Sequence, residues 1–231
     1  MSTEIDVGAE TRVPLTRERV LSTAVTLADQ GGIESLSMRK LAQALDVVPM
    51  ALYRHVADKD ELLNALVDVV IGEIDRPLEG ADWQTTIRAR ILSARRALLR
   101  HRWASRLMES RTTPTPVVLE YMDSMIGLFR TGGFSLDVTH HALHAMGSRM
   151  FGFTQELFND ASESDPQTDA EMWGGMADTY PYIFEIFTTI SHDDRSVVGA
   201  GCDDQFEFEF ALDLMLDGLE KLKRRSSRSG D

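Results

Sequence analysis

The 231-residue chain has a single cysteine, Cys202, and therefore cannot form a disulfide bond within itself. It also lacks any uninterrupted apolar run that approaches the roughly 20 residues of a membrane-spanning helix. The first residues, MSTEIDVGAE, include acidic side chains and no apolar core, so they do not resemble a secretory or organelle-targeting signal. These absences predict a protein of the reducing cytoplasm without a membrane partner.

Basic residues are also scarce, because 24 Lys and Arg stand against 37 Asp and Glu and give a net charge of −13. The deficit is unevenly distributed along the chain. Residues 16–60 contain six basic and six acidic side chains, whereas residues 61–231 contain 17 and 28. An acidic C-terminal part would repel nucleic acid, whereas the neutral N-terminal segment would not. This difference favours a defined docking pose over non-specific adhesion.

Motifs of catalysis are missing as well. No internal repeat, no Gly-rich phosphate loop and no nucleophile motif occurs in the sequence. The paired carboxylates Asp193-Asp194 and Asp203-Asp204 fall in predicted loops, where catalytic geometry is hard to maintain. We therefore expect neither an enzyme nor a bound cofactor, although a helical enzyme stays open as an alternative.

Residues 37–59 contain the most informative pattern, two short amphipathic segments separated by a tight break. Asp46 interrupts the first segment, and Val47 supplies an apolar residue between the two helices. The second segment begins near Pro49, whose fixed φ and missing N–H suit a first helical turn, and extends for roughly two turns. This spacing predicts a helix-turn-helix whose second helix fits a major groove about 12 Å wide. The buried sides are marked by Met38, Leu41, Ala42, Leu45, Leu52 and Val56.

The remaining chain predicts an all-α protein. A first helix begins near Thr16 and ends at Gly31-Gly32, so three helices form an N-terminal head at residues 14–60. Asp58 and Glu61 form a capping box for the next helix, which opens a larger helical body at residues 61–225.

Residues that end or begin helices predict the further helices of the body. Pro77 and Gly80 end the connecting helix, Asp82 starts another, and residues 112–116 break the chain again. A helix ends at Gly132-Gly133, and the next one extends from Ser135 to about Phe158. The acidic, Ser-rich residues 159–168 predict a mobile loop, and residues 191–204 form a second polar break. Residues 206–222 predict a final helix, although their opening FEFEF also fits an alternating strand.

The segment Leu52-Tyr53-x-His55-Val56-x-x-Lys59-x-x-Leu62-Leu63 after such a turn resembles the DNA-binding head of TetR-type repressors. The likeness covers most of residues 14–225. Short segments that resemble the family's body follow in the expected order: residues 77–80 with 83–84, residues 97–99 with 101–102, residues 132–136 and residues 218–221.

The resemblance implies a ligand-released repressor that binds a palindromic DNA operator as a homodimer. It implies phosphate contacts from Tyr53, His55 and Lys59, and base or phosphate contacts from Arg39. Family members mostly carry Gly where Asp46 stands and Thr or Ser where Ala51 stands, so a left-handed Asp is expected and a hydroxyl contact to phosphate is lost. The complete set of expected DNA-binding residues is Ser37, Met38, Arg39, Pro49, Met50, Ala51, Tyr53, Arg54, His55 and Lys59.

The resemblance also implies a small-molecule effector in the body. Candidate lining residues combine apolar walls with a few polar groups. They are Arg90, Trp103, Met108, Ser124, Met125, His140, His144 and Trp173.

Metal chemistry is not expected in this body. Family members that hold magnesium-chelated tetracycline use histidines, whereas Met108 and the stretch Ile74-Asp75-Arg76-Pro77 occupy the matching places here. Tetracycline is therefore not the expected effector. His140 and His144 share a helical face and could grip a metal ion, but no nearby fourth ligand is evident and we predict no metal site.

Apolar faces predict how two subunits would meet. The stripe within residues 206–222 and one face of the helix at residues 136–158 offer more apolar surface than one body needs to bury, and two copies would form a four-helix interface. Gly147 and Gly152 would permit close approach of helices. A helical ligand-binding protein without DNA binding stays open as an alternative, because Asp46, Ala51 and the neutral head depart from the family pattern.

Overall fold

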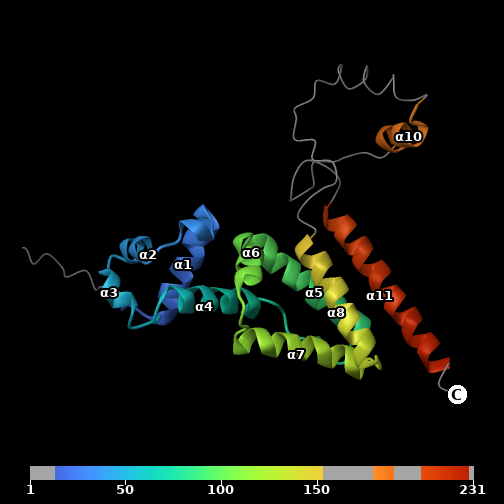
Figure 1. The fold of residues 1–231 in the computed structure, drawn as a ribbon, viewed down its shortest axis with the longest axis horizontal. Helices are drawn as coiled ribbons and strands as arrows, with labels where there is room; N and C mark the ends of the chain where they lie inside the picture. The colour runs from blue at the N-terminus through green and yellow to red at the C-terminus, as the bar shows by residue number, and fades with distance from the viewer. Residues whose placement is uncertain (1–13, 153–178, 190–203, 229–231) are drawn as a thin grey trace, which may run out of the picture. The chain divides into compact units, whose positions relative to one another are not determined.

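A computed structural model describes residues 14–152, 179–189 and 204–228 of the chain. Every regular element in these ranges is a helix, which confirms the predicted all-α fold, and no helix there is long and apolar enough to cross a membrane. The elements (Figure 1) are α1 (Arg17–Gly31), η1 (Ile33–Ser35), α2 (Met38–Ala44), α3 (Pro49–Leu52), α4 (Lys59–Gly72), α5 (Trp83–Arg100), α6 (Trp103–Ser110), α7 (Pro116–Thr131), α8 (Leu136–Gly152), α10 (Pro181–Thr189) and α11 (Asp204–Arg228).

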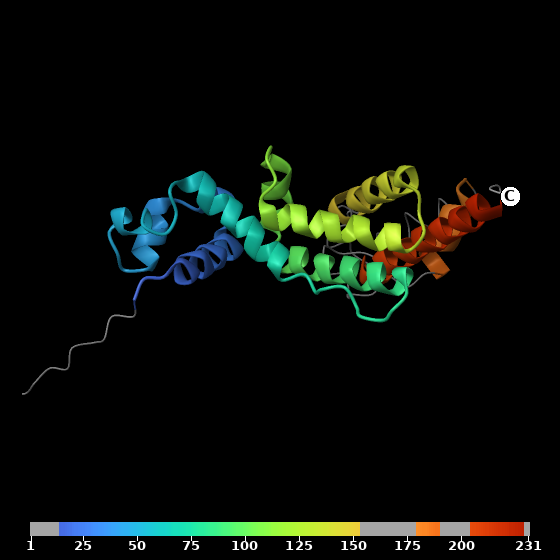
Figure 2. The ribbon, with the colours of Figure 1, turned by 90° about the horizontal axis from the view of Figure 1, so that it is seen from below.

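The helices form two compact units. Unit 1 contains the chain up to Pro77 and residues Leu92–Ser124, and unit 2 contains Leu78–Ile91 and the chain from Met125. Helices α5 and α7 each contribute residues to both units. Figure 2 shows α1, α2 and α3 grouped around the beginning of α4, so unit 1 includes the predicted head together with α4, α6 and parts of α5 and α7.

Side-chain caps fix where α1, α2 and α4 begin, at Thr16 and Asp58 as the sequence predicted and also at Ser37. The Thr16 hydroxyl accepts a hydrogen bond from the Arg19 amide at 3.1 Å, and Gly32 ends α1 with φ of 75°. Ser37 caps α2 in the same way through the amide of Lys40. The Asp58 carboxylate accepts from the Glu61 amide at 2.7 Å and begins α4.

Replacing Asp58 with Ala should therefore lower the free energy of unfolding by about 1 kcal/mol, because the first turn of α4 loses its side-chain acceptor. Thermal or urea unfolding of the purified protein would measure this loss. Asp58→Asn is the matched control, since an amide oxygen still caps the helix, and it should unfold close to the unmodified protein. Equal destabilisation by both substitutions would show that charge, not capping, is what Asp58 contributes.

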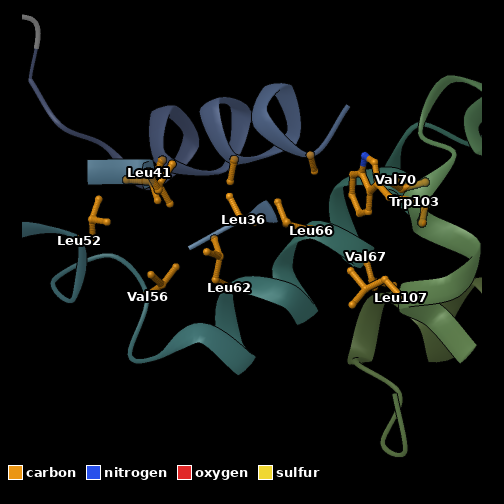
Figure 3. Packing of buried hydrophobic residues seen from close by; sticks show 14 of the residues in the cluster. Leu36, Leu41, Leu52, Val56, Leu62, Leu66, Val67, Val70, Trp103 and Leu107 are labelled. Carbon is orange, nitrogen blue, oxygen red and sulfur yellow. The ribbon is translucent and has the colours of Figure 1, made fainter. Parts of the chain in front are cut away.

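The core of unit 1 lies between the head helices and continues along α4. Leu36, Leu41, Leu52 and Leu62 are at most 1% exposed and fill the space between the first four helices. Figure 3 shows Trp103 and Leu107 of α6 lying against Val67 and Val70 of α4. Helix α6 therefore belongs to the same hydrophobic cluster as the head.

Two elements differ from the sequence expectation. Helix α3 extends only from Pro49 to Leu52, because the next amides bond to carbonyls three residues back, as in His55 N–H to Leu52 O at 2.8 Å. The chain also breaks at His101 and Arg102, so α6 is a separate helix that we did not predict. The His101 side chain is 3% exposed and held by carboxylates, so tertiary contacts position this break without Gly or Pro.

Unit 2 is held by an aromatic cluster and by ion pairs. The Trp83 ring meets Phe134 edge-on at 4.7 Å, and Phe129 meets Phe134 at 5.6 Å between centroids. Arg88 of α5 bonds to Asp213 at 2.6 Å and to Glu209 at 2.7 Å, which fixes α11 beside α5. These carboxylates raise the pKa of Arg88 further above its ordinary value, chiefly through the hydrogen bonds that Arg88 donates to Asp213.

Candidate nucleic-acid interface

The predicted DNA-binding residues gather on α2, α3, the turns beside them and the first residue of α4. Arg39, Pro49, Met50, Tyr53, Arg54 and Lys59 are exposed, whereas Met38, Ala51 and His55 are half-buried. Ser37 is also half-buried, and its hydroxyl accepts a hydrogen bond from the Lys40 amide at 3.2 Å. Leu52 and Val56, at 0% and 1% exposed, anchor the same segment from beneath. The arrangement therefore presents one outward face on a rigid support.

The turn between α2 and α3 depends on Asp46. Its φ of 56° is the left-handed conformation that we predicted for this position, and Asp tolerates it better than most residues other than Gly and Asn. The Val47 amide then bonds to the Ala42 carbonyl at 3.0 Å, and the Val47 side chain packs against the core cluster. This closes the angle between the two helices and places Pro49 at the first turn of α3.

A network centred on Arg17 of α1 holds the far end of this segment. The Arg17 guanidinium donates to the His55 carbonyl and to Glu61 Oε1, the latter at 2.8 Å. The other Glu61 oxygen accepts from the Ala57 amide. These hydrogen bonds, first that of Ala57 and then that of Arg17, lower the pKa of the Glu61 carboxyl, so the network is complete above the ordinary pKa of Glu and weakens as pH falls through the lowered value.

The exposed face combines positive charge with apolar side chains. Arg39, Lys40, Arg54 and Lys59 are all exposed, and Lys59 is the first residue of α4. Val48 and Met50 lie between these cations with exposures of 68% and 74%. Arginine and lysine contacts to phosphate, with other side chains directed at base edges, are the components of DNA recognition by a short helix.

Three further residues belong to this site, and sequence reasoning missed them. Val48 precedes the proline and was not considered, although an apolar residue between a turn and a helix start is a detectable signal. Lys40 was not named among the DNA-binding residues. Arg17 lies 38 residues before His55, so no local pattern could indicate their hydrogen bond.

The candidate effector-lining residues divide between the two units. Trp103, Met108 and Ser124 belong to unit 1, while Arg90, Met125, His140 and His144 belong to unit 2. Trp103, Arg90 and Met125 are buried, and His140 and His144 are exposed. Trp173 lies outside the residues that the structure describes.

Unit 1 itself contains a cleft of about 470 Å³ beside Trp103. Trp103 Nε1 donates to Asp29 Oδ1 at 2.6 Å, and the same carboxylate lies 2.8 Å from His101 Nδ1. His101 Nε2 lies 3.1 Å from Glu73, so one buried ring joins α1 to the end of α4. The lining is Ala28, Asp29, Gly32, Ile33, Glu34, Leu99, Arg100, Arg102, Trp103 and Arg106.

The histidines of α8 lie on its outer face. The rings of His140 and His144 are 4.5 Å apart, and His141 lies 3.6 Å from Asp137. Within the described ranges, no group of three or more His, Cys, Asp or Glu side chains is placed to hold a metal ion.

Comparisons with known proteins agree with this geometry. Residues 20–66 match the family model of bacterial regulatory proteins of the tetR family, and residues 76–223 match that of the tetracyclin repressor-like C-terminal domain. An HTH-type transcriptional regulator from Saccharopolyspora erythraea is 37% identical over 127 residues, so the match spans 54% of either chain. The tetracycline repressor protein class C from Escherichia coli is 31% identical over 213 residues, 90% of this chain and 92% of that one.

Solved structures show the same architecture. The TetR family protein ActR from Streptomyces coelicolor, in complex with (S)-DNPA, is 26% identical and has a TM-score of 0.65, covering 90% of this chain and 98% of that one. The matched models together span the head and the body. The chain therefore belongs to the TetR family, as a helix-turn-helix transcriptional regulator with a C-terminal ligand-binding domain.

Proposed function

We propose that this chain is a repressor that binds a palindromic operator as a homodimer and releases it when a small molecule binds the body. The observation that carries the proposal is the outward face of α3, where Met50 and Tyr53 are exposed while Leu52 between them is completely buried. A short helix held so firmly, with cations on both sides, is suited to the major groove.

The two faces of α11 support dimerisation. Phe208, Leu212 and Leu216 are at most 2% exposed within unit 2, whereas Phe206, Phe210 and Leu214 on another face are 63%, 54% and 59% exposed. A second apolar stripe at helical spacing is typical of a helix that packs against a partner subunit.

For helix α8, one face of which we predicted to join this interface, side chains are described only as far as Gly147. Its exposed residues in the described part are mainly polar, with Asp137, His140, His141 and His144 on one stripe and Leu136 at the helix start. The buried face, with Ala142 and Met146, is already used inside unit 2. The exposed apolar patch that we assign to the dimer is therefore the α11 stripe of Phe206, Phe210 and Leu214.

The effector is an organic molecule other than magnesium-chelated tetracycline. Met108, which stands where a metal-binding histidine is expected, packs against the unit 1 core and offers only a weakly coordinating thioether. The ActR structure contains (S)-DNPA, an example of a family relative with a different ligand. Arg90, buried in unit 2, is suited to a ligand that carries a polar group.

Binding to DNA can be tested by gel-shift titration with fragments from the promoter region beside the gene. Tyr53→Ala and Lys59→Ala should each weaken binding about tenfold, because each removes a contact to phosphate. Lys59→Ala should also reduce the slope of log K against log salt concentration by about one.

Lys221→Ala is the matched control, because Lys221 is an exposed lysine on α11, far along the chain from the interface. It should bind DNA like the unmodified protein. If Tyr53→Ala and Lys59→Ala also bind like the unmodified protein, the assignment of this face is wrong. If no fragment is bound even at low ionic strength, the repressor function itself is wrong.

A further inference from the structure

The recognition segment is unusually apolar where it is most exposed. Between residues 14 and 77, the strongly exposed large apolar side chains are Val48 at 68%, Met50 at 74% and Tyr53 at 44%. Other apolar residues of the same segment, such as Leu45, Leu52 and Val56, are at most 4% exposed. The head thus buries its apolar residues efficiently and leaves a small patch, which we call the Val48–Met50 patch, at the tip of the segment.

Polar groups that form hydrogen bonds with base edges are sparse beside this patch. Val48 and Ala51 have no polar side-chain atom, Pro49 has no backbone N–H, and the Met50 thioether is at most a weak acceptor. Arg54 is the exposed side chain of this segment that donates strong hydrogen bonds. Direct readout by hydrogen bonds therefore falls to the end of the segment and to the exposed cations of α2, Arg39 and Lys40.

The major groove has one apolar feature that such a patch can recognise. Thymine projects its 5-methyl group into that groove, while the other base edges present hydrogen-bond donors and acceptors there. Placing Val48 or Met50 over cytosine or adenine would bury a polar edge without a partner, which is unfavourable. Thymine is thus the base whose major-groove edge best matches the Val48–Met50 patch.

We propose that Val48 and Met50 determine operator specificity by packing on thymine 5-methyl groups, so that each half-site has one or two thymines beneath the start of α3. This inference rests on the proposed function, and it names the base that the site selects. The flanking cations Arg39, Arg54 and Lys59 fix the register on phosphates or guanine. The long, unbranched side chain of Met50 can adapt to the exact position of a methyl group.

The test uses the full-length protein and a random duplex library, from which bound sequences are selected. In the enriched half-site, each thymine is then replaced by uracil, which removes only the methyl group. Binding should weaken roughly fourfold at the one or two thymines under the patch, the value expected for one buried carbon, and stay unchanged at the other thymines.

Variants connect this effect to the patch. Met50→Ala and Val48→Ala should bind the thymine duplex more weakly and should lose the difference between thymine and uracil at one position each. Met50→Leu should retain the difference, since it keeps the apolar contact. Both residues are exposed, so unfolding midpoints should not change, and the salt dependence should not change because no phosphate contact is lost.

These outcomes distinguish failure of the thymine inference from failure of the proposed repressor function. Enrichment of a sequence that binds equally well with uracil at every thymine overturns the inference and leaves the repressor function intact. So does a Met50→Ala, Val48→Ala double variant that still distinguishes thymine from uracil. A library that yields no enriched sequence overturns the proposed function, and this inference with it.

Discussion

A protein carrying Phe210→Asp should sediment as a monomer and bind its operator at least about a hundredfold more weakly than the unmodified dimer. Phe210 lies in the exposed stripe of α11 at 54% exposure, and its ring stacks on that of Phe206. In a symmetric interface the substitution introduces two carboxylates into apolar surface. In a dimer, binding of one head raises the effective concentration of the other head at its half-site, which commonly strengthens binding by a factor of about 10² to 10⁴. A monomer loses this gain.

Sedimentation at micromolar concentration measures the first effect and gel shift measures the second. Leu119→Asp provides the comparison, because Leu119 of α7 is 52% exposed and is not part of the α11 stripe. That variant should remain dimeric and bind normally. A Phe210→Asp protein that still sediments as a dimer would place the interface elsewhere, and a monomeric unmodified protein would remove the dimer from the proposal.

Trp103→Ala should lower the free energy of unfolding by about 3 to 5 kcal/mol, the usual range for truncating a buried Trp. The ring is 7% exposed, packs on the cluster shared with the head, and donates its N–H to Asp29 at 2.6 Å. Truncation of Trp103 to Ala therefore leaves a cavity between α4 and α6. It also removes a hydrogen-bond donor from the Asp29 carboxylate.

Urea unfolding separates these two contributions. Trp103→Phe retains most of the apolar volume but loses the N–H and part of the ring system, so it should cost less than Trp103→Ala, about 1 to 2 kcal/mol. If Trp103→Ala unfolds at nearly the same urea concentration as the unmodified protein, Trp103 is not part of a tight core. It would then be better interpreted as a residue that lines a cavity for a ligand.

Local chemistry explains why the head could be predicted from sequence. Thr16, Ser37 and Asp58 cap helices through hydrogen bonds that span three residues, so the pattern is visible in any short window. Asp46 in the left-handed region and Pro49 at a helix start are equally local. The helix rather than the strand at residues 206–210 is confirmed by α11, whose buried stripe continues at helical spacing.

Other features depend on contacts between distant residues and could not be predicted. The break between α5 and α6 has no Gly or Pro, and its His101 is held by Asp29 and Glu73, which are 72 and 28 residues away in sequence. Apolar periodicity also cannot tell which of two stripes faces inward. On α11, Phe208 and Leu212 are buried while Phe206 and Phe210 are exposed, and both pairs fit helical spacing.

The imidazole of His101 restricts how the first helices can move. Its Nδ1 lies 2.8 Å from Asp29 Oδ1, and its Nε2 lies 3.1 Å from Glu73 Oε1. Because these carboxylates come from α1 and from the end of α4, the turn before α6 cannot shift alone without breaking a hydrogen bond to one of them. A displacement of this turn would thus act on both α1, which carries Arg17, and α4, which begins at Lys59. These two helices supply the Arg17 network that holds His55.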